Sequence, residues 1–129
     1  MGVTVGVIGL GRIGAFHTDT LSTLDGVDGL VVTDERSEVK DAVAAKFGAR
    51  PVDSVQDLLA SGVDGVIVAA ATPSHASLVL ACVNAGIPVF CEKPLAATPG
   101  ECLAIVREVS KSSVPVQVGY NRRFSPAFV

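Results

Sequence analysis

The feature that most constrains the fold of this chain is a glycine-rich turn directly after its first apolar run. The run Val3–Ile8 is followed by the pattern G-x-G-x-x-G at residues 9–14, and then by a segment whose apolar residues have helical spacing. Asp34 follows about twenty residues later, at the end of the next apolar run. A strand, a glycine turn, a helix and a second strand that ends in an acidic residue are together typical of a dinucleotide-binding site.

The three glycines of this turn have different expected roles. Gly9 permits the tight turn, Gly11 leaves the backbone open to a pyrophosphate, and Gly14 lets the first helix pack close to the sheet. Backbone N–H groups at the start of that helix, around Arg12 and Ile13, are expected to face the phosphates. The alternative is a glycine turn that serves packing only.

Asp34 predicts which dinucleotide the site prefers. Its carboxylate would accept hydrogen bonds from the adenosine ribose hydroxyls and repel a phosphorylated ribose, which favours NAD over NADP. Glu35 and Arg36 follow directly and belong to the same predicted site. Arg36 keeps NADP open as the less favoured alternative, because its guanidinium group could turn toward a 2′-phosphate.

Strand-like and helix-like segments alternate along the chain. The predicted strands cover residues 3–8, 29–33, 49–52, 65–70, 87–91 and 114–119. The predicted helices cover residues 11–24, 37–47, 72–84 and 98–111, and a short helix that ends at Leu59 is capped by Asp53 or Ser54. This order predicts an α/β fold, a Rossmann-like, doubly wound parallel sheet of about six strands with helices on both faces.

The composition argues against several other classes of protein. The net charge of −3 is small and scattered, so no basic face for nucleic acid is implied. No apolar run is long enough for a membrane span and no signal peptide precedes the first strand, so a cytoplasmic protein is expected. Cys82, Cys91 and Cys102 lack metal-type spacing and are expected to be reduced and buried, with a nucleophilic Cys91 as the minor alternative.

Ligands of a doubly wound sheet bind beyond the carboxyl ends of its strands. The segments expected at that edge also carry most of the chemically reactive side chains of the chain. They are residues 9–14, 34–36, 71–75, 92–94 and 120–123. The sequence therefore predicts that a ligand binds at this edge of the sheet.

Two further motifs make the prediction specific. Glu92-Lys93-Pro94 directly follows the fifth predicted strand, and V-G-Y-N-R-R-F follows at residues 118–124. With these motifs, Thr72-Pro73 and the glycine turn, essentially the whole chain resembles the Gfo/Idh/MocA family, which includes glucose–fructose oxidoreductase and inositol dehydrogenase. The resemblance implies an NAD-dependent oxidoreductase that transfers hydride between the nicotinamide and a hydroxyl of a sugar or polyol, with myo-inositol as one candidate.

The resemblance also implies roles for single residues. Lys93 matches the catalytic lysine of the family, which lies between the nicotinamide and the reacting hydroxyl, where an ammonium group stabilises developing alkoxide charge. The bond before Pro94 is expected to be cis, as in similar motifs, with an ordinary trans turn as the alternative. His75 is expected either near the ribose or phosphates of the cofactor or idle at a helix start, and His17 is expected to be packed or solvent-facing. The other implied cofactor-binding residues are Ala71, Thr72, Pro73, Glu92, Pro94, Asn121 and Arg122.

Family members have a second α/β domain after the nucleotide-binding domain. The resemblance therefore implies that residues 1–124 form the NAD(P)-binding domain and that residues 125–129 begin the connection to a C-terminal substrate domain. That domain is expected to supply an Asp and a His for proton transfer and to build a homo-oligomer, so this chain alone would bind NAD without turnover. A non-catalytic, dinucleotide-binding regulatory module of the same fold is the alternative, which the retained Lys93 disfavours.

Overall fold

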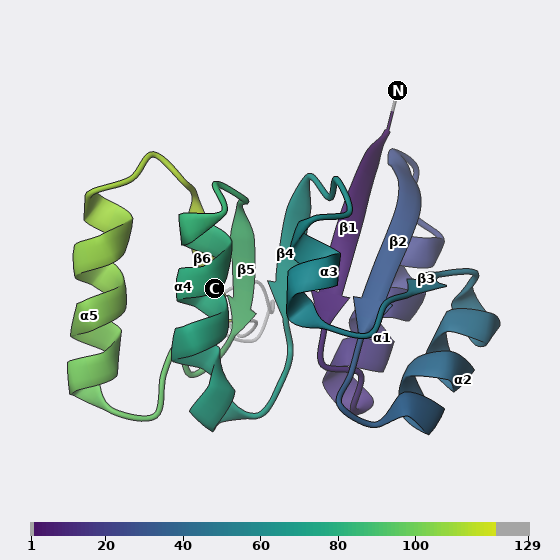
Figure 1. Ribbon diagram of the computed structural model, residues 1–129, viewed down its shortest axis with the longest axis horizontal. Coiled ribbons are helices and arrows are strands. Elements are labelled where there is room, and N and C mark those ends of the chain that lie inside the picture. The colour runs from purple at the N-terminus through teal and green to yellow at the C-terminus, as the bar shows by residue number, and fades with distance from the viewer. Residues whose placement is uncertain (1, 121–129) are drawn as a thin grey trace, which may run out of the picture.

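Six parallel strands form one sheet in the computed structural model, which describes residues 2–120 (Figure 1). The strand order is β3-β2-β1-β4-β5-β6, so the chain builds outward from β1 through β2 and β3 and then crosses to the other side of β1. The carboxyl ends of β1 and β4 flank this crossing, and doubly wound sheets bind their ligands at such a point. The strands are β1 Val3–Ile8, β2 Val27–Thr33, β3 Arg50–Pro51, β4 Gly65–Val68, β5 Val89–Glu92 and β6 Val116–Gly119.

Helices cover both faces of the sheet, as the sequence predicts. On one face lie α1 (Arg12–Ser22) and α2 (Ser37–Phe47), and on the other lie α3 (Val55–Leu59), α4 (His75–Asn84) and α5 (Pro99–Ser110). Alternation along the strands divides the core in the same way, because Val7 and Val32 pack toward α1 and α2 while Ile8 and Val31 pack toward the other three helices. None of the helices within residues 2–120 has the length and apolar run that a membrane span requires.

Side-chain caps determine where two of the predicted helices begin. At the start of α3, Ser54 Oγ accepts a hydrogen bond from Asp57 N at 3.0 Å, so Ser54 rather than Asp53 is the cap. At the start of α5, Thr98 Oγ1 accepts a hydrogen bond from Glu101 N at 3.2 Å. These bonds satisfy backbone N–H groups that the first turn of a helix leaves without a partner.

The predicted elements are confirmed with small shifts at their ends. The strands predicted to begin at residues 87 and 114 begin at Val89 and Val116, directly after Pro88 and Pro115, which have no N–H to donate to a neighbouring strand. The helix predicted from residue 72 starts as the 3₁₀ turn η1 (Thr72–Ser74) before α4. The predicted domain boundary at residue 124 and the predicted connection at residues 125–129 lie outside the described residues.

Candidate functional site

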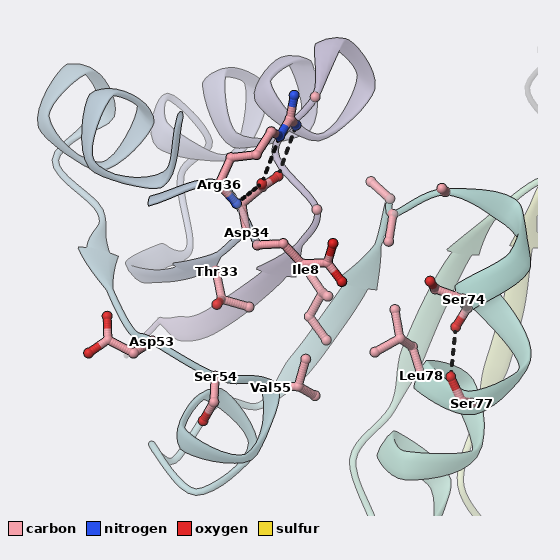
Figure 2. A pocket seen from close by; sticks show the side chains of 16 residues that line it. Ile8, Thr33, Asp34, Arg36, Asp53, Ser54, Val55, Ser74, Ser77 and Leu78 are labelled. Carbon is pink, nitrogen blue, oxygen red and sulfur yellow. Dashed lines mark hydrogen bonds and ion pairs between the residues drawn. The ribbon is translucent and has the colours of Figure 1, made fainter. Parts of the chain in front are cut away.

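A cleft of about 560 Å³ opens between the carboxyl ends of β1, β2 and β4 (Figure 2). This volume lies within the range of about 300–1,000 Å³ that is typical of small-molecule and cofactor sites. The predicted cofactor-binding residues that line the cleft are Gly9, Gly11, Asp34, Glu35, Arg36 and Ala71. Ser74, from the predicted segment 71–75, also lines it, and its other walls include residues outside the predicted segments, among them Asp53, Ser54, Val55, Ser77 and Leu78.

The glycine turn has two positions determined by packing and one that faces open space. Gly9 has a φ of 91°, and a Cβ there would lie 2.5 Å from Ala70 N. A Cβ on Gly14 would collide with the carbonyl oxygen of Gly9, so the close approach of α1 to the turn depends on that glycine. A Cβ on Gly11 would meet only Arg36 Nη2, at 3.8 Å. Packing therefore explains Gly9 and Gly14, whereas the space at Gly11 is available to a ligand.

The start of α1 adds backbone donors to this open space. Gly11 is the N-cap and has no side chain to cap the helix, and the first helical bond of this turn runs from Ala15 N to Gly11 O at 2.8 Å. The N–H groups of the first turn, at Arg12, Ile13 and Gly14, have no partner within the helix. Such N–H groups together with the helix dipole form a favourable place for phosphate oxygens.

Asp34 ends β2 with a nearly buried carboxylate, whose side chain is 6% exposed. Two backbone groups hold it, since Leu10 N donates to Oδ2 at 2.7 Å and Arg36 N donates to Oδ1 at 2.8 Å. The Arg36 side chain donates to both oxygens, from Nε to Oδ1 at 3.0 Å and from Nη2 to Oδ2 at 3.2 Å (Figure 2). Each oxygen thus accepts one backbone and one side-chain hydrogen bond, which uses the four lone-pair sites of the carboxylate.

These contacts set the charge state of the carboxylate. Burial acts to raise the pKa of Asp34, but the hydrogen bonds from Arg36 and Leu10 outweigh it and bring the pKa below its ordinary value. Asp34 is therefore a fixed negative charge at neutral pH. The Arg36 side chain is 56% exposed, so its guanidinium group has solvent into which it can move.

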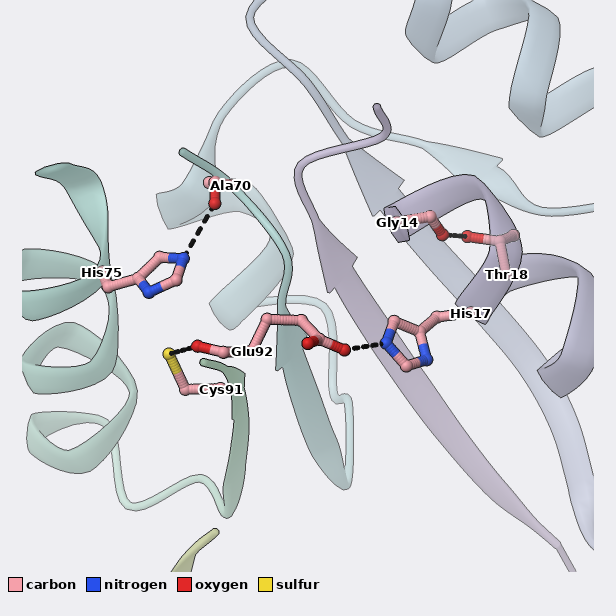
Figure 3. Close-up of polar contacts among 7 residues, drawn as sticks. All are labelled: Gly14, His17, Thr18, Ala70, His75, Cys91 and Glu92. Carbon is pink, nitrogen blue, oxygen red and sulfur yellow. Dashed lines mark hydrogen bonds and ion pairs between the residues drawn. The ribbon is translucent and has the colours of Figure 1, made fainter. Parts of the chain in front are cut away.

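The turn after β5 lies at the same edge of the sheet as the cleft. Its Lys93–Pro94 peptide bond is cis, as the sequence resemblance led us to expect. Lys93 is exposed at the end of β5, whereas the carboxylate of Glu92 is bound to His17 on α1, with 2.5 Å between Nε2 and Oε1 (Figure 3). The sequence patterns did not predict this pair, because its members are 75 residues apart and no local spacing relates them.

His75 is the first residue of α4 and is buried. Its residue is 1% exposed, and its ring nitrogens lie on two carbonyl oxygens, Nδ1 on Pro94 O at 2.7 Å and Nε2 on Ala70 O at 2.8 Å. Both ring nitrogens thus face carbonyl oxygens of the protein, and His75 is not among the residues that line the cleft. Figure 3 shows the contact with Ala70.

The remaining predicted residues fall into two groups. Thr72 and Pro73 form η1 beside Ala71, so they lie next to the cleft without lining it. Asn121 and Arg122 lie outside the described residues. Within residues 2–120, no group of three His, Cys, Asp or Glu side chains is arranged to hold a metal ion.

The minor alternative of a nucleophilic Cys91 is not supported. Cys91 is fully buried on β5, and burial, with smaller effects of Glu92 and Cys82, raises the pKa of its thiol to about 12. The reactive form of cysteine is the thiolate, which such a thiol does not form at neutral pH. Cys82, Cys91 and Cys102 are all free thiols, and Cys82 and Cys91 are buried as expected, whereas Cys102 is only partly buried.

The sequence of this chain is similar to that of known oxidoreductases. A family model described as an oxidoreductase family with an NAD-binding Rossmann fold matches residues 3–120. Inositol 2-dehydrogenase 1 of Saccharopolyspora erythraea is 48% identical, over 100% of this chain and 40% of its own length. This chain therefore spans about 40% of the length of that curated relative.

Solved structures match the fold closely. GenD2 from gentamicin A biosynthesis, determined in complex with NAD, has a TM-score of 0.90 and 28% identity over 97% of this chain and 36% of its own. The scyllo-inositol dehydrogenase of Lactobacillus casei, determined with NAD(H) and scyllo-inositol, has a TM-score of 0.92 over 98% of this chain and 38% of its own. At 22% identity, this second likeness concerns the fold alone.

Proposed function

Because this chain belongs to the Gfo/Idh/MocA oxidoreductase family, we propose that it is the nucleotide-binding part of an NAD-dependent dehydrogenase. Its substrate would be a polyol of the inositol type, oxidised at a ring hydroxyl to the ketone. The observation that carries this proposal is the joint position of a dinucleotide cleft and an exposed Lys93 at one edge of the sheet. The curated relatives named for action on inositol support the substrate class.

The residues of the cleft fit a dinucleotide. The open space over Gly11 and the backbone donors at the start of α1 suit the pyrophosphate. Asp34 suits the adenosine ribose, because the two backbone N–H groups would keep its carboxylate in place if the guanidinium group of Arg36 moved away. That movement would free one acceptor site on each oxygen, which matches the two hydroxyl groups of an unphosphorylated ribose.

The same geometry supports NAD as the preferred cofactor. A 2′-phosphate would replace one of these hydroxyl donors by an anion beside the charged carboxylate of Asp34, which costs binding energy. Arg36 would offset part of that cost, because it lies within reach of the same place and forms strong charge-assisted bonds with phosphate. We therefore propose a preference for NAD with residual binding of NADP.

Lys93 is the residue to which we assign catalysis. When bound, the nicotinamide supplies the hydride acceptor for this chemistry. The hydroxyl that loses the hydride from its carbon must also lose its proton, and an ammonium group beside it stabilises the negative charge that develops on that oxygen. The exposed position of Lys93 leaves its side chain open to a substrate that approaches from outside this domain.

The curated relatives are longer than this chain, which supports the presence of a further domain in the whole enzyme. Since this chain spans about 40% of the inositol 2-dehydrogenase of S. erythraea, we propose that a further domain supplies most substrate contacts and the Asp and His that exchange protons with Lys93. That domain would also provide the contacts of a homo-oligomer. The three free thiols support a reducing, cytoplasmic location.

Replacement of Lys93 tests this function against the regulatory alternative. In the full-length protein, Lys93→Ala should abolish NADH formation from myo-inositol while NAD binding changes by less than about threefold, because the ammonium acts on the reacting oxygen and not on the cleft. Lys111→Ala is the matched control, since Lys111 is an exposed lysine after α5 that pairs with Glu108. A protein that binds NAD but turns over none of a panel of polyols would instead be a dinucleotide-binding regulator.

A further inference from the structure

We propose that both histidines of the chain, His17 and His75, are positioning residues that hold the turn at residues 92–94 and thereby fix Lys93. The inference rests on the proposed function in one respect, the assignment of catalysis to Lys93. Its structural part, that the two rings immobilise this turn, stands on the contacts alone.

The first anchor lies after Lys93. The ring of His75, at the start of α4, contacts the carbonyl oxygen of Pro94 through Nδ1 and that of Ala70 through Nε2. A carbonyl oxygen can only accept, so a neutral ring donates to one of these two oxygens, and the anchor that we propose is the tautomer in which Nδ1 donates to Pro94 O. The His75 residue is 1% exposed, and its two contacts link the turn after β5 to the chain that leaves β4.

The second anchor lies before Lys93. His17 Nε2 and Glu92 Oε1 are 2.5 Å apart, and both side chains are largely shielded, with 21% and 23% exposed. The ring of His17 also packs edge-on against Phe90, with 5.9 Å between centroids. Phe90 and Glu92 are alternate residues of β5 and point to the same face of the sheet, so His17 reaches the strand at two places.

Together the anchors hold the turn from opposite faces of the sheet. His17 belongs to α1 on one face and His75 to α4 on the other, and the residues that they hold, Glu92 and Pro94, are the two neighbours of Lys93. Lys93 itself is exposed, so its position depends on the backbone on either side. Reacting groups need placement within about 1 Å, and a shift of that size can cost about 10²-fold in rate.

Conservative substitutions separate this role from general support of the fold. The amide nitrogen of asparagine lies close to where Nδ1 of histidine lies, and that of glutamine close to where Nε2 lies. At position 75, His75→Asn keeps a donor for Pro94, whereas His75→Gln keeps one only for Ala70. At position 17 the order reverses, since His17→Gln keeps the donor for Glu92 and His17→Asn does not.

The proposal predicts that, in the full-length enzyme, asparagine is the better replacement at position 75 and glutamine the better replacement at position 17. His75→Gln and His17→Asn should each lower kcat about 10–100-fold, and His75→Asn and His17→Gln should retain at least about a third of it. The KM for NAD should change by less than about threefold in all four variants, since neither ring lines the cleft. Equal losses of kcat for both substitutions at a site, with matching losses of thermal stability, would overturn the proposal in favour of a purely structural role.

Hydrogen exchange of the cofactor-free protein tests the anchors without activity. Amide exchange in the peptide that covers residues 91–96 should be faster in His75→Gln and His17→Asn than in the wild type and the other two variants. Unchanged exchange there would refute the anchoring itself. Retained turnover in Lys93→Ala would refute the proposed function instead, and the exchange data would then still decide whether the histidines hold the turn.

Discussion

Replacement of Asp34 by alanine gives the sharpest test of how the cleft selects its cofactor. The substitution removes an acceptor that would bind two ribose hydroxyls, each through a bond to a charged group worth about 1.5–3 kcal/mol. Part of this gain is offset in the wild type, because the guanidinium group of Arg36 must first leave the same two sites. The expected net loss for NAD is about 1.5–3 kcal/mol, or about 10–100-fold in Kd. For NADP the loss should be less than about threefold, because the substitution also removes the repulsion between Asp34 and the 2′-phosphate.

Calorimetric titration with NAD and NADP measures both effects, and Arg36→Ala is the matched control. That variant leaves the carboxylate of Asp34 held by Leu10 N and Arg36 N, because both donors are backbone groups. It should bind NAD at least as tightly as the wild type and NADP more weakly. Since Asp34→Ala leaves the N–H of Leu10 without its acceptor, at a cost of about 1–3 kcal/mol, urea unfolding must show that each variant is folded.

The outcome that refutes this reasoning is an equal loss of affinity for the two cofactors. Asp34 would then support the turn through Leu10 without contacting the ribose. Asp34→Asn distinguishes the cases further, because an amide oxygen can still accept from Leu10 N but carries no charge to repel a phosphate. If selectivity depends on charge, this variant should bind NAD and NADP with similar affinity.

Two further predictions concern stability. Gly14→Ala should lower the free energy of unfolding in urea by about 3 kcal/mol or more, because its new Cβ would collide with the carbonyl oxygen of Gly9. The control Gly26→Ala should lower it by about 1–2 kcal/mol, because Gly26 has a φ of 92° but open space around it. Equal losses would contradict the packing role of Gly14. Burial raises the pKa of Cys82 to about 11 and that of Cys91 to about 12. Above about pH 9 the unfolded chain therefore loses thiol protons that the native state keeps, so the free energy of unfolding should fall as pH rises. A Cys82→Ala, Cys91→Ala double variant should lose less stability between about pH 8 and about pH 10, and an undiminished decline would assign the alkaline sensitivity to other groups.

Local sequence patterns determined the order of the elements and much of the cleft. The glycine turn after β1 and the acid that ends β2 depend on the backbone of a few consecutive residues, and the structure has both at the predicted edge of the sheet. The caps at Ser54 and Thr98 belong to the same class, because a cap bonds to an N–H group only three residues away. The motif at residues 92–94 likewise favours the cis bond at Lys93–Pro94 that the structure has.

The contacts of the two histidines and the saturation of Asp34 came only from the tertiary structure. His75 is 19 residues from Pro94 and His17 is 75 residues from Glu92, so only the packing of α4 and α1 on opposite faces of β5 brings these groups together. The sequence identifies Asp34 as the acid that ends β2, but the four hydrogen bonds that its carboxylate accepts depend on where the turn at Leu10 and residue Arg36 lie in space. Periodicity and motif spacing report on neighbours within a few residues. Which donor binds a given acceptor atom depends on the distances between helices and strands, and only the folded sheet sets these distances.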